Sequence, residues 1–152
     1  MKTFKAFFYF FLASALVLSV SSCGKGGDDE ELGPHIKEPN VERFNNNISV
    51  PGTQILDFRS EAEFNVEHIP GAINIPATLT NTASDNGEFA KKVLSTFPDQ
   101  TKKIYMYGGN GGSYGQLEYI VPGRISRLGY GQANSIVLLG GFKAWKDFMD
   151  KE

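Results

Sequence analysis

Short apolar runs alternate with amphipathic segments along most of the chain. Residues 54–58 (QILDF) predict a buried strand, and residues 72–75 predict a second one that ends at Pro76. Two further apolar runs, 103–107 (KIYMY) and 135–139 (SIVLL), have the length and β-branched or aromatic content of buried strands. The pattern therefore predicts at least four strands, separated by segments long enough to hold helices.

Helices are predicted between these strands. Ser60 and Glu63 have the spacing of a capping box, in which each side chain binds a backbone amide at a helix start, so a helix is expected over 61–66. Residues 78–87 are polar and predict a loop. Apolar residues at helical spacing then predict a helix over 88–97.

Two more helical faces lie in the last third of the chain. The first consists of Leu117, Ile120, Val121, Ile125 and Leu128. Pro122 and Gly123 should kink this helix or divide it in two, and Gly129 is a plausible cap at its end. The second face consists of Phe142, Trp145, Phe148 and Met149. Strands that alternate with helices predict a single α/β domain with a mostly parallel sheet, covered by helices on both faces.

The N-terminus has the pattern of an export signal. Lys2 and Lys5 precede an apolar stretch over residues 6–20, and small residues lead to a processing site, so residues 1–22 are expected to be a signal peptide. An ordinary secretory signal and a short membrane anchor are the alternatives, although the stretch is shorter than the roughly 20 residues that span a bilayer. No folded domain is expected in this segment.

Val20-Ser21-Ser22-Cys23 resembles a bacterial lipobox. The resemblance implies that Cys23 receives lipid, with acyl chains such as palmitate, and becomes the first residue of a lipoprotein held in the cell envelope. The following residues, up to Asn40, are rich in Gly, Pro and acidic side chains, so 23–40 is expected to be a lipidated, flexible tether. Its acidic run, 28–31, resembles that of surface-exposed lipoproteins and favours the outer membrane or cell surface; a linker extended by its own charge is the alternative.

Composition limits what the remaining domain, expected over 41–152, can do. The formal net charge of the chain is −2, and loss of the signal peptide removes two lysines, so a basic nucleic-acid surface is not expected. Cys23 is the only cysteine, which leaves no internal disulfide. With only two histidines, few ligands are present, and neither a metal site nor a cofactor is predicted.

Two segments resemble the rhodanese-like domain family. Residues 55–76 (ILDFRSEAEFNVEHIPGAINIP) are similar to its pattern of strand, Asp-x-Arg, helix and His-Ile-Pro-Gly-Ala turn, and residues 139–145 (LGGFKAW) to its closing Gly-Gly and Trp. The residues that carry the resemblance are Asp57, Arg59, His68, Pro70, Gly71, Gly140, Gly141 and Trp145. It implies a five-stranded parallel sheet between helices, with an active loop that follows the fourth strand.

The residues in the place of that loop lack the family's chemistry. In active members a cysteine begins the loop and carries sulfur as a persulfide, whereas the matching position here is Gly108, or Tyr107 if the loop is one residue longer. Members of the family often carry an arginine later in the loop as well. Its place in this sequence falls near Gly112 or Ser113, and no arginine is present there. Sulfur transfer, and the related phosphatase and arsenate reductase reactions, need the thiolate, so they are not expected of this chain alone.

The loop itself is still a candidate binding site. Its residues are Gly108, Gly109, Asn110, Gly111, Gly112, Ser113 and Tyr114. Backbone amides at the end of a parallel strand can form a concavity for a small anion, although the glycines can also serve only to allow a tight turn. Tyr107 and Tyr114 flank the loop and are candidates to line a recognition pocket.

Other polar residues of the motifs are expected to be structural. A hydroxyl nucleophile in the loop would need a base, but His35 lies in the tether, and His68 is expected to be a buried histidine with a hydrogen-bonding role. Asp57 and Arg59 are expected to form an ion pair that braces the end of the sheet. No catalytic residue is assigned.

The function predicted from these features is that of a membrane-anchored, non-catalytic rhodanese-like module, which binds a small anion or scaffolds an envelope protein. An enzyme related to the sulfurtransferases, which handles thiosulfate or sulfane sulfur with the thiol of a partner, is the alternative. A domain kept only for assembly, with a vestigial pocket, is the third possibility. The absence of a loop cysteine from the sequence favours the non-catalytic module over the enzyme, and the sequence does not separate the binding module from the domain kept for assembly.

Overall fold

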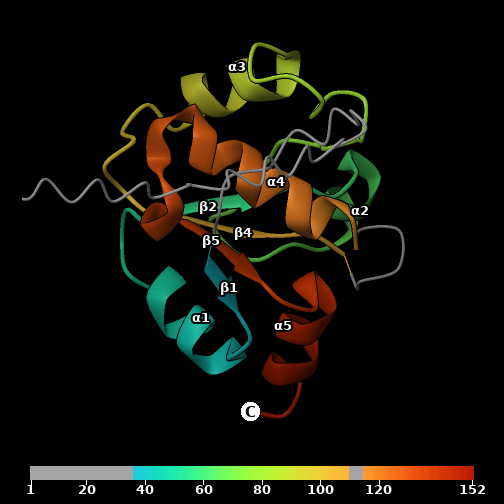
Figure 1. Cartoon of the computed structure of the whole chain (residues 1–152). Coiled ribbons are helices and arrows are strands. Elements are labelled where there is room, and N and C mark those ends of the chain that lie inside the picture. The colour runs from blue at the N-terminus through green and yellow to red at the C-terminus, as the bar shows by residue number, and fades with distance from the viewer. Residues whose placement is uncertain (1–35, 110–114) are drawn as a thin grey trace, which may run out of the picture. The chain divides into compact units, whose positions relative to one another are not determined.

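A five-stranded sheet forms the centre of the domain. The computed structural model describes residues 36–109 and 115–152. In this part of the chain the strand order is β1-β5-β4-β2-β3, and every neighbouring pair is parallel, which confirms the predicted α/β fold (Figure 1). The strands are β1 (Ile36–Glu38), β2 (Gln54–Asp57), β3 (Ile73–Asn74), β4 (Ile104–Tyr107) and β5 (Ser135–Leu138).

Helices cover both faces of the sheet. Figure 1 shows α1 (Val41–Ile48) and α5 (Gly141–Met149) on one side, and α3 (Glu88–Thr96) and α4 (Leu117–Ile125) on the other. The remaining helical segments are α2 (Glu61–Val66), the π-helical turn η2 (Ser126–Tyr130) and the 3-10 turn η3 (Gln132–Asn134). Within the described residues, no helix combines the length and the apolar content needed to cross a membrane.

The register of the central strands divides the core into two layers. One layer faces α1 and α5, and its aligned sheet residues are Ile55, Tyr105 and Ile136. The other layer faces α3 and α4, and its aligned residues are Leu56, Met106 and Val137. Successive side chains of a strand point to opposite faces of the sheet. Because helices cover both faces here, the strands are apolar at successive positions and do not alternate with polar residues.

The predicted capping box is present at the start of α2. The Ser60 hydroxyl accepts a hydrogen bond from the Glu63 amide at 3.3 Å, and the Glu63 carboxylate accepts one from the Ser60 amide at 3.2 Å. This reciprocal pair fixes the first turn of α2 although none of its residues is buried. The helix occupies the predicted range, and it follows β2 directly at the carboxyl end of the sheet.

The boundary expected between tether and domain was wrong. Residues 36–38, which fell within the expected tether, form the edge strand β1, where Ile36 aligns with Ile136 of β5. Asn40 then caps α1 by accepting a hydrogen bond from the Arg43 amide at 2.7 Å. The folded domain therefore includes residues from Ile36 onward, and 23–35 lie outside the described part of the chain. A strand of three residues is too short to show a hydrophobic pattern in the sequence. Its pairing partner also lies about a hundred residues away, so no neighbouring residues indicate the pairing.

The helix is not divided at Pro122, which was one of the two alternatives expected there. The α-helix α4 continues through Pro122 and Gly123 to Ile125. Proline removes one amide donor from the helix, but Val121 and Ile125 are fully buried in the core and hold the turns on either side. The backbone leaves helical geometry later, at Gly129, where φ is +109° as suits the glycine cap that was expected.

Candidate functional site

The candidate site lies where the carboxyl ends of the central strands meet. Asp57 ends β2, and Tyr107 ends β4 and is followed by the buried residues Gly108 and Gly109. In parallel sheets, ligands bind at this edge because the loops that follow neighbouring strands converge there. The rest of the predicted binding loop, Asn110, Gly111, Gly112, Ser113 and Tyr114, lies outside the described residues.

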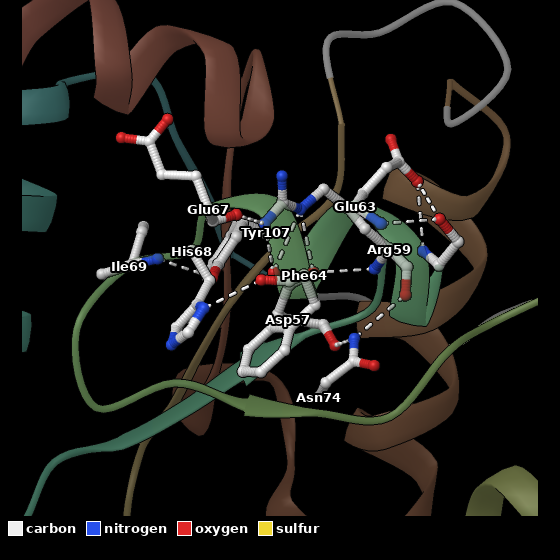
Figure 2. A network of polar contacts seen from close by, with 10 residues as sticks. Asp57, Arg59, Glu63, Phe64, Glu67, His68, Ile69, Asn74 and Tyr107 are labelled. Carbon is white, nitrogen blue, oxygen red and sulfur yellow. Dashed lines mark hydrogen bonds and ion pairs between the residues drawn. The ribbon is translucent and has the colours of Figure 1, made fainter.

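A buried ion pair braces this edge. An Arg59 Nη2 lies 2.6 Å from Asp57 Oδ2, and Arg59 Nε lies within 3.1 Å of both carboxylate oxygens, which makes the pair bidentate (Figure 2). The two side chains are 5% and 0% exposed. Arg59 Nη2 also donates to the Glu67 carbonyl at 2.8 Å, which ties the residue that follows α2 to the sheet. The expected structural ion pair is present.

Two aromatic rings, which lie close to each other with centroids 6.1 Å apart, contact the guanidinium of Arg59. Its central carbon lies 4.0 Å from the centre of the Phe142 ring and 5.4 Å from the centre of the Tyr107 ring. A planar guanidinium gains from such cation–π contacts when it is shielded from water. Arg59 is therefore held by the Asp57 carboxylate and by contacts with two neighbouring rings.

Tyr107 is part of this brace. Its side chain is fully buried, and its hydroxyl accepts a hydrogen bond from the Ile69 amide at 3.1 Å (Figure 2). Burial, followed by the nearby Asp57 carboxylate, raises the pKa of Tyr107 well above its usual value, so the phenol stays protonated. The expectation that Tyr107 lines a recognition pocket was wrong, because its ring belongs to the layer beneath α5.

The His-Ile-Pro-Gly-Ala turn has a structural role, but its histidine is not buried. His68 is exposed, its Nδ1 lies 2.9 Å from the Phe64 carbonyl, and its ring stacks on Phe64 with centroids 3.8 Å apart. The expected hydrogen bond is present and the expected burial was wrong, since α2 lies on the surface at this point. Pro70 is exposed, and Gly71 has φ +83°, a backbone geometry that favours glycine.

The Gly140-Gly141 pair brings the start of α5 against the start of the loop. Gly141 has φ +57°, and a Cβ at this position would lie 1.9 Å from the Gly109 carbonyl oxygen. The next amide, that of Phe142, donates to the Gly108 carbonyl at 2.8 Å. Further along α5, Trp145 Nε1 donates to Asn45 Oδ1 at 3.0 Å, which joins α5 to α1. The motif glycines and Trp145 therefore position the helix beside the loop.

A pocket of about 190 Å³ opens between these elements. It is lined by Arg59, Glu63, Gly109, Phe142 and Lys143. Of these, Glu63, Phe142 and Lys143 were not predicted as site residues; the only signal in the sequence was that Phe142 and Lys143 directly follow the Gly-Gly pair. The side chains offer hydrogen-bond donors, one carboxylate and an aromatic wall, which suits non-covalent binding. Within residues 36–109 and 115–152, no three His, Cys, Asp or Glu residues gather to hold a metal ion.

Comparison with known proteins agrees with this architecture. A curated protein from Saccharomyces cerevisiae, named thiosulfate:glutathione sulfurtransferase, is 26% identical over 97 residues, which make up 62% of this chain and 66% of that protein. The atomic-resolution structure of an uncharacterized Saccharomyces cerevisiae protein matches with a TM-score of 0.54 at 24% identity, over 78% of this chain and 97% of the other. A rhodanese-like domain from an Anabaena protein matches with a TM-score of 0.50 at 22% identity, over 76% and 74% of the two chains.

These two structural likenesses concern the fold. The family itself is assigned from the sequence, because the sequence model of the rhodanese-like domain matches residues 40–148, which run from the cap of α1 to the last turn of α5. The Asp57–Arg59 brace, the glycines that begin α5 and the loop after β4 all lie within the matched range. The chain belongs to the rhodanese-like domain family.

Proposed function

We propose that this protein is a lipid-anchored rhodanese-like module of the bacterial cell envelope, which binds a small anion or an envelope protein and does not itself transfer sulfur. The observation that carries the proposal is that Gly108, which directly follows β4, is the residue that the family resemblance matches to the cysteine of active members, with Tyr107 as the alternative. A persulfide needs a thiolate at that point, and glycine has no side chain to provide one.

The surroundings of Gly108 favour a retained framework. The Phe142 amide fixes the Gly108 carbonyl, and the buried Asp57–Arg59 pair holds the adjacent edge of the sheet. The pocket at this edge offers the Arg59 guanidinium and the Lys143 ammonium as donors, with Glu63 as an acceptor. This arrangement suits a ligand with both anionic and hydrogen-bond-donating groups, bound without covalent chemistry.

The anchor is the second part of the proposal. Cys23 is the only cysteine and follows a lipobox-like segment, so its thiol would be consumed by the lipid and could not serve the domain. Replacement of this residue, Cys23→Ser, should abolish labelling by radioactive palmitate and move the protein to the soluble fraction. Unchanged membrane association of this variant would contradict the anchor, while leaving the proposal for the pocket untouched.

The alternative is an enzyme that uses the thiol of a partner. It is favoured by the relative named thiosulfate:glutathione sulfurtransferase, because that name contains both a sulfur donor and a separate thiol. In this mechanism the present chain would hold thiosulfate, and the thiolate of a second molecule would attack its outer sulfur, breaking the S–S bond to give a persulfide and sulfite. Turnover of thiosulfate with glutathione by the unmodified chain would support this alternative over the first proposal.

The experiment that separates the two is a sulfurtransferase assay on the purified full chain and on Gly108→Cys. Thiosulfate is the donor, and cyanide or glutathione is the acceptor. Ser95→Cys is the matched control, because it places a thiol on the exposed face of α3, away from the loop. Circular dichroism and thermal melting should show that all three chains are folded.

A silent natural chain together with activity in Gly108→Cys, and none in Ser95→Cys, is the expected result. It would mean that the loop can still stabilise a thiolate and that only the nucleophile is missing. If Gly108→Cys is folded and silent, the loop does not retain the active cradle, and a scaffold role is favoured over anion binding. Activity of the natural chain would overturn the non-catalytic proposal.

A further inference from the structure

A second cavity lies at the opposite end of the sheet, away from the Gly-rich loop. Its volume is about 380 Å³, and it is bordered by Gln54, which begins β2, and by Lys103, which directly precedes β4. Because all strands are parallel, this end is separated from Gly108 by the whole length of β4. The turn that contains Val50 and Pro51 also lines it.

Tyr105 lines this cavity and is unusual among the tyrosines of the core. It is 6% exposed, and its ring packs edge-on against Phe44 of α1, with centroids 5.6 Å apart. Its hydroxyl has no hydrogen-bond partner within residues 36–109 and 115–152, whereas the hydroxyl of Tyr107 has one. The Tyr105 hydroxyl is not one of the fully enclosed polar atoms without a partner, and Tyr105 lines the cavity, so its phenol is a donor available to a ligand there.

The charge at the mouth of the cavity is positive. Lys102 and Lys103 line it, and none of its lining residues is acidic. Lys102 lies 3.8 Å from Asp99, a long and exposed pair that contributes little, and Lys103 has no ion pair in the described part of the chain. Burial, followed by the nearby Glu38 carboxylate, raises the pKa of Tyr105. The charge of Glu38 is itself neutralised by Arg43, whose Nε lies 2.7 Å from Glu38 Oε2.

We propose that this cavity binds the phosphate group of a small organic phosphate or of a lipid headgroup. The two ammonium groups match a phosphate of charge near −2, and the Tyr105 hydroxyl donates a hydrogen bond to one of its oxygens. The amide side chains of Asn47 and Gln54 can accept hydrogen bonds from hydroxyls on the organic part, which contacts Val50 and Pro51. This site is independent of the function proposed for the loop.

The test uses the full chain, purified in an uncharged detergent and labelled for NMR. Glycerol 3-phosphate is titrated at constant ionic strength into the natural chain, Tyr105→Phe and Lys103→Gln. The first variant keeps the ring on Phe44 and removes only the hydroxyl; the second removes only the charge. Lys91→Gln is the matched control, since Lys91 is an exposed lysine of α3 on the other face of the sheet.

Saturable shifts confined to residues 47–54 and 102–105 are expected, with no change at Gly108 and Gly109. Each of the two variants should weaken binding about tenfold, which is the scale of one hydrogen bond to a charged group, and Lys91→Gln should not. Absence of saturation in every arm would overturn the proposal. Shifts that Tyr105→Phe and Lys103→Gln leave unchanged would overturn it as well.

A second arm distinguishes the source of the phosphate. The same chains are placed in lipid nanodiscs made of phosphatidylcholine alone or with phosphatidylglycerol. Shifts at the same residues that require phosphatidylglycerol, and that both variants reduce, assign the phosphate to a lipid headgroup. Saturation by glycerol 3-phosphate without any effect of phosphatidylglycerol assigns it to a soluble ligand.

Discussion

Two tyrosines on the same face of β4 show how the two ends of the sheet differ. Tyr107, at the carboxyl end, is fully buried, and its hydroxyl accepts a hydrogen bond from the Ile69 amide. Tyr105, at the amino end, is almost as well buried, but its hydroxyl has no partner in the described residues and lies in the wall of an open cavity. A satisfied phenol braces the fold, whereas an unsatisfied one is available for a ligand.

The same contrast holds for the charged groups at the two ends. At the carboxyl end, Arg59 is locked by Asp57 and by two aromatic rings, so most of its hydrogen-bonding capacity stabilises the domain. At the amino end, Lys103 carries an exposed charge without a partner among the described residues. Asp57 and Arg59 of the family motifs therefore make buried contacts at one end, and an unassigned cavity occurs at the other end, where Lys103 has no ion pair among the described residues.

The largest effect on the braced end is expected from Gly141→Ala. An added Cβ would lie 1.9 Å from the Gly109 carbonyl oxygen at φ +57°, so α5 or the loop must move. We expect a loss of about 4 kcal/mol or more in the free energy of unfolding, measured with urea. Gly52→Ala at the open end, with φ +81° and no atom within 4 Å, should lose only about 1 kcal/mol. Equal losses would show that the two ends are not packed differently.

The next effect concerns the buried ion pair. Asp57→Asn leaves the guanidinium of Arg59 buried and without its counter-charge, which should cost about 3–5 kcal/mol of stability. Asp147→Asn is the control, because it removes the carboxylate from an exposed pair with Lys143 and should change the unfolding midpoint little. A small loss in Asp57→Asn would mean that the ring contacts alone hold Arg59.

The tyrosine comparison can be tested directly with two conservative variants. Tyr107→Phe leaves the buried Ile69 amide without an acceptor and should cost about 1–3 kcal/mol. Tyr105→Phe removes a hydroxyl that pairs with no described residue, so its stability should be unchanged or slightly higher in the absence of ligand. Urea unfolding of both variants gives the two values side by side, and a reversed order would contradict the comparison.

The smallest effect is a pH dependence at the edge strand β1. Hydrogen bonding to Arg43 lowers the pKa of Glu38 below its usual value, so Glu38 contributes stability above the unfolded pKa near 4.3 and loses it as the pH falls through the folded pKa. The melting temperature of Glu38→Gln should be below that of the natural chain at pH 7. The difference in melting temperature should disappear toward pH 3. A difference that persists at that pH would mean that the substitution acts through packing and not through the charge.

The candidate site was predicted from the sequence only in part. Asp57 and Arg59 are two residues apart, so their pairing follows from the chain leaving β2, and Ser60 and Glu63 define the start of α2 in the same local way. The pocket beside Gly109 needs Phe142 and Lys143, which lie more than thirty residues further along the chain. Only the packing of α5 against the loop brings them to the site.

By itself, the sequence determined the alternation of strands and helices, the capping box and the family, because these depend on residues that are neighbours in the chain. Tertiary structure decided that Ile36–Glu38 is a strand, that α4 continues through Pro122, and that Tyr107 is a brace while Tyr105 borders a cavity. In each case the deciding contact is made by a distant segment, as when β5 pairs with β1 or when Ile69 binds Tyr107. Burial and hydrogen-bond partners are properties of the packed molecule, and residue type alone does not specify them.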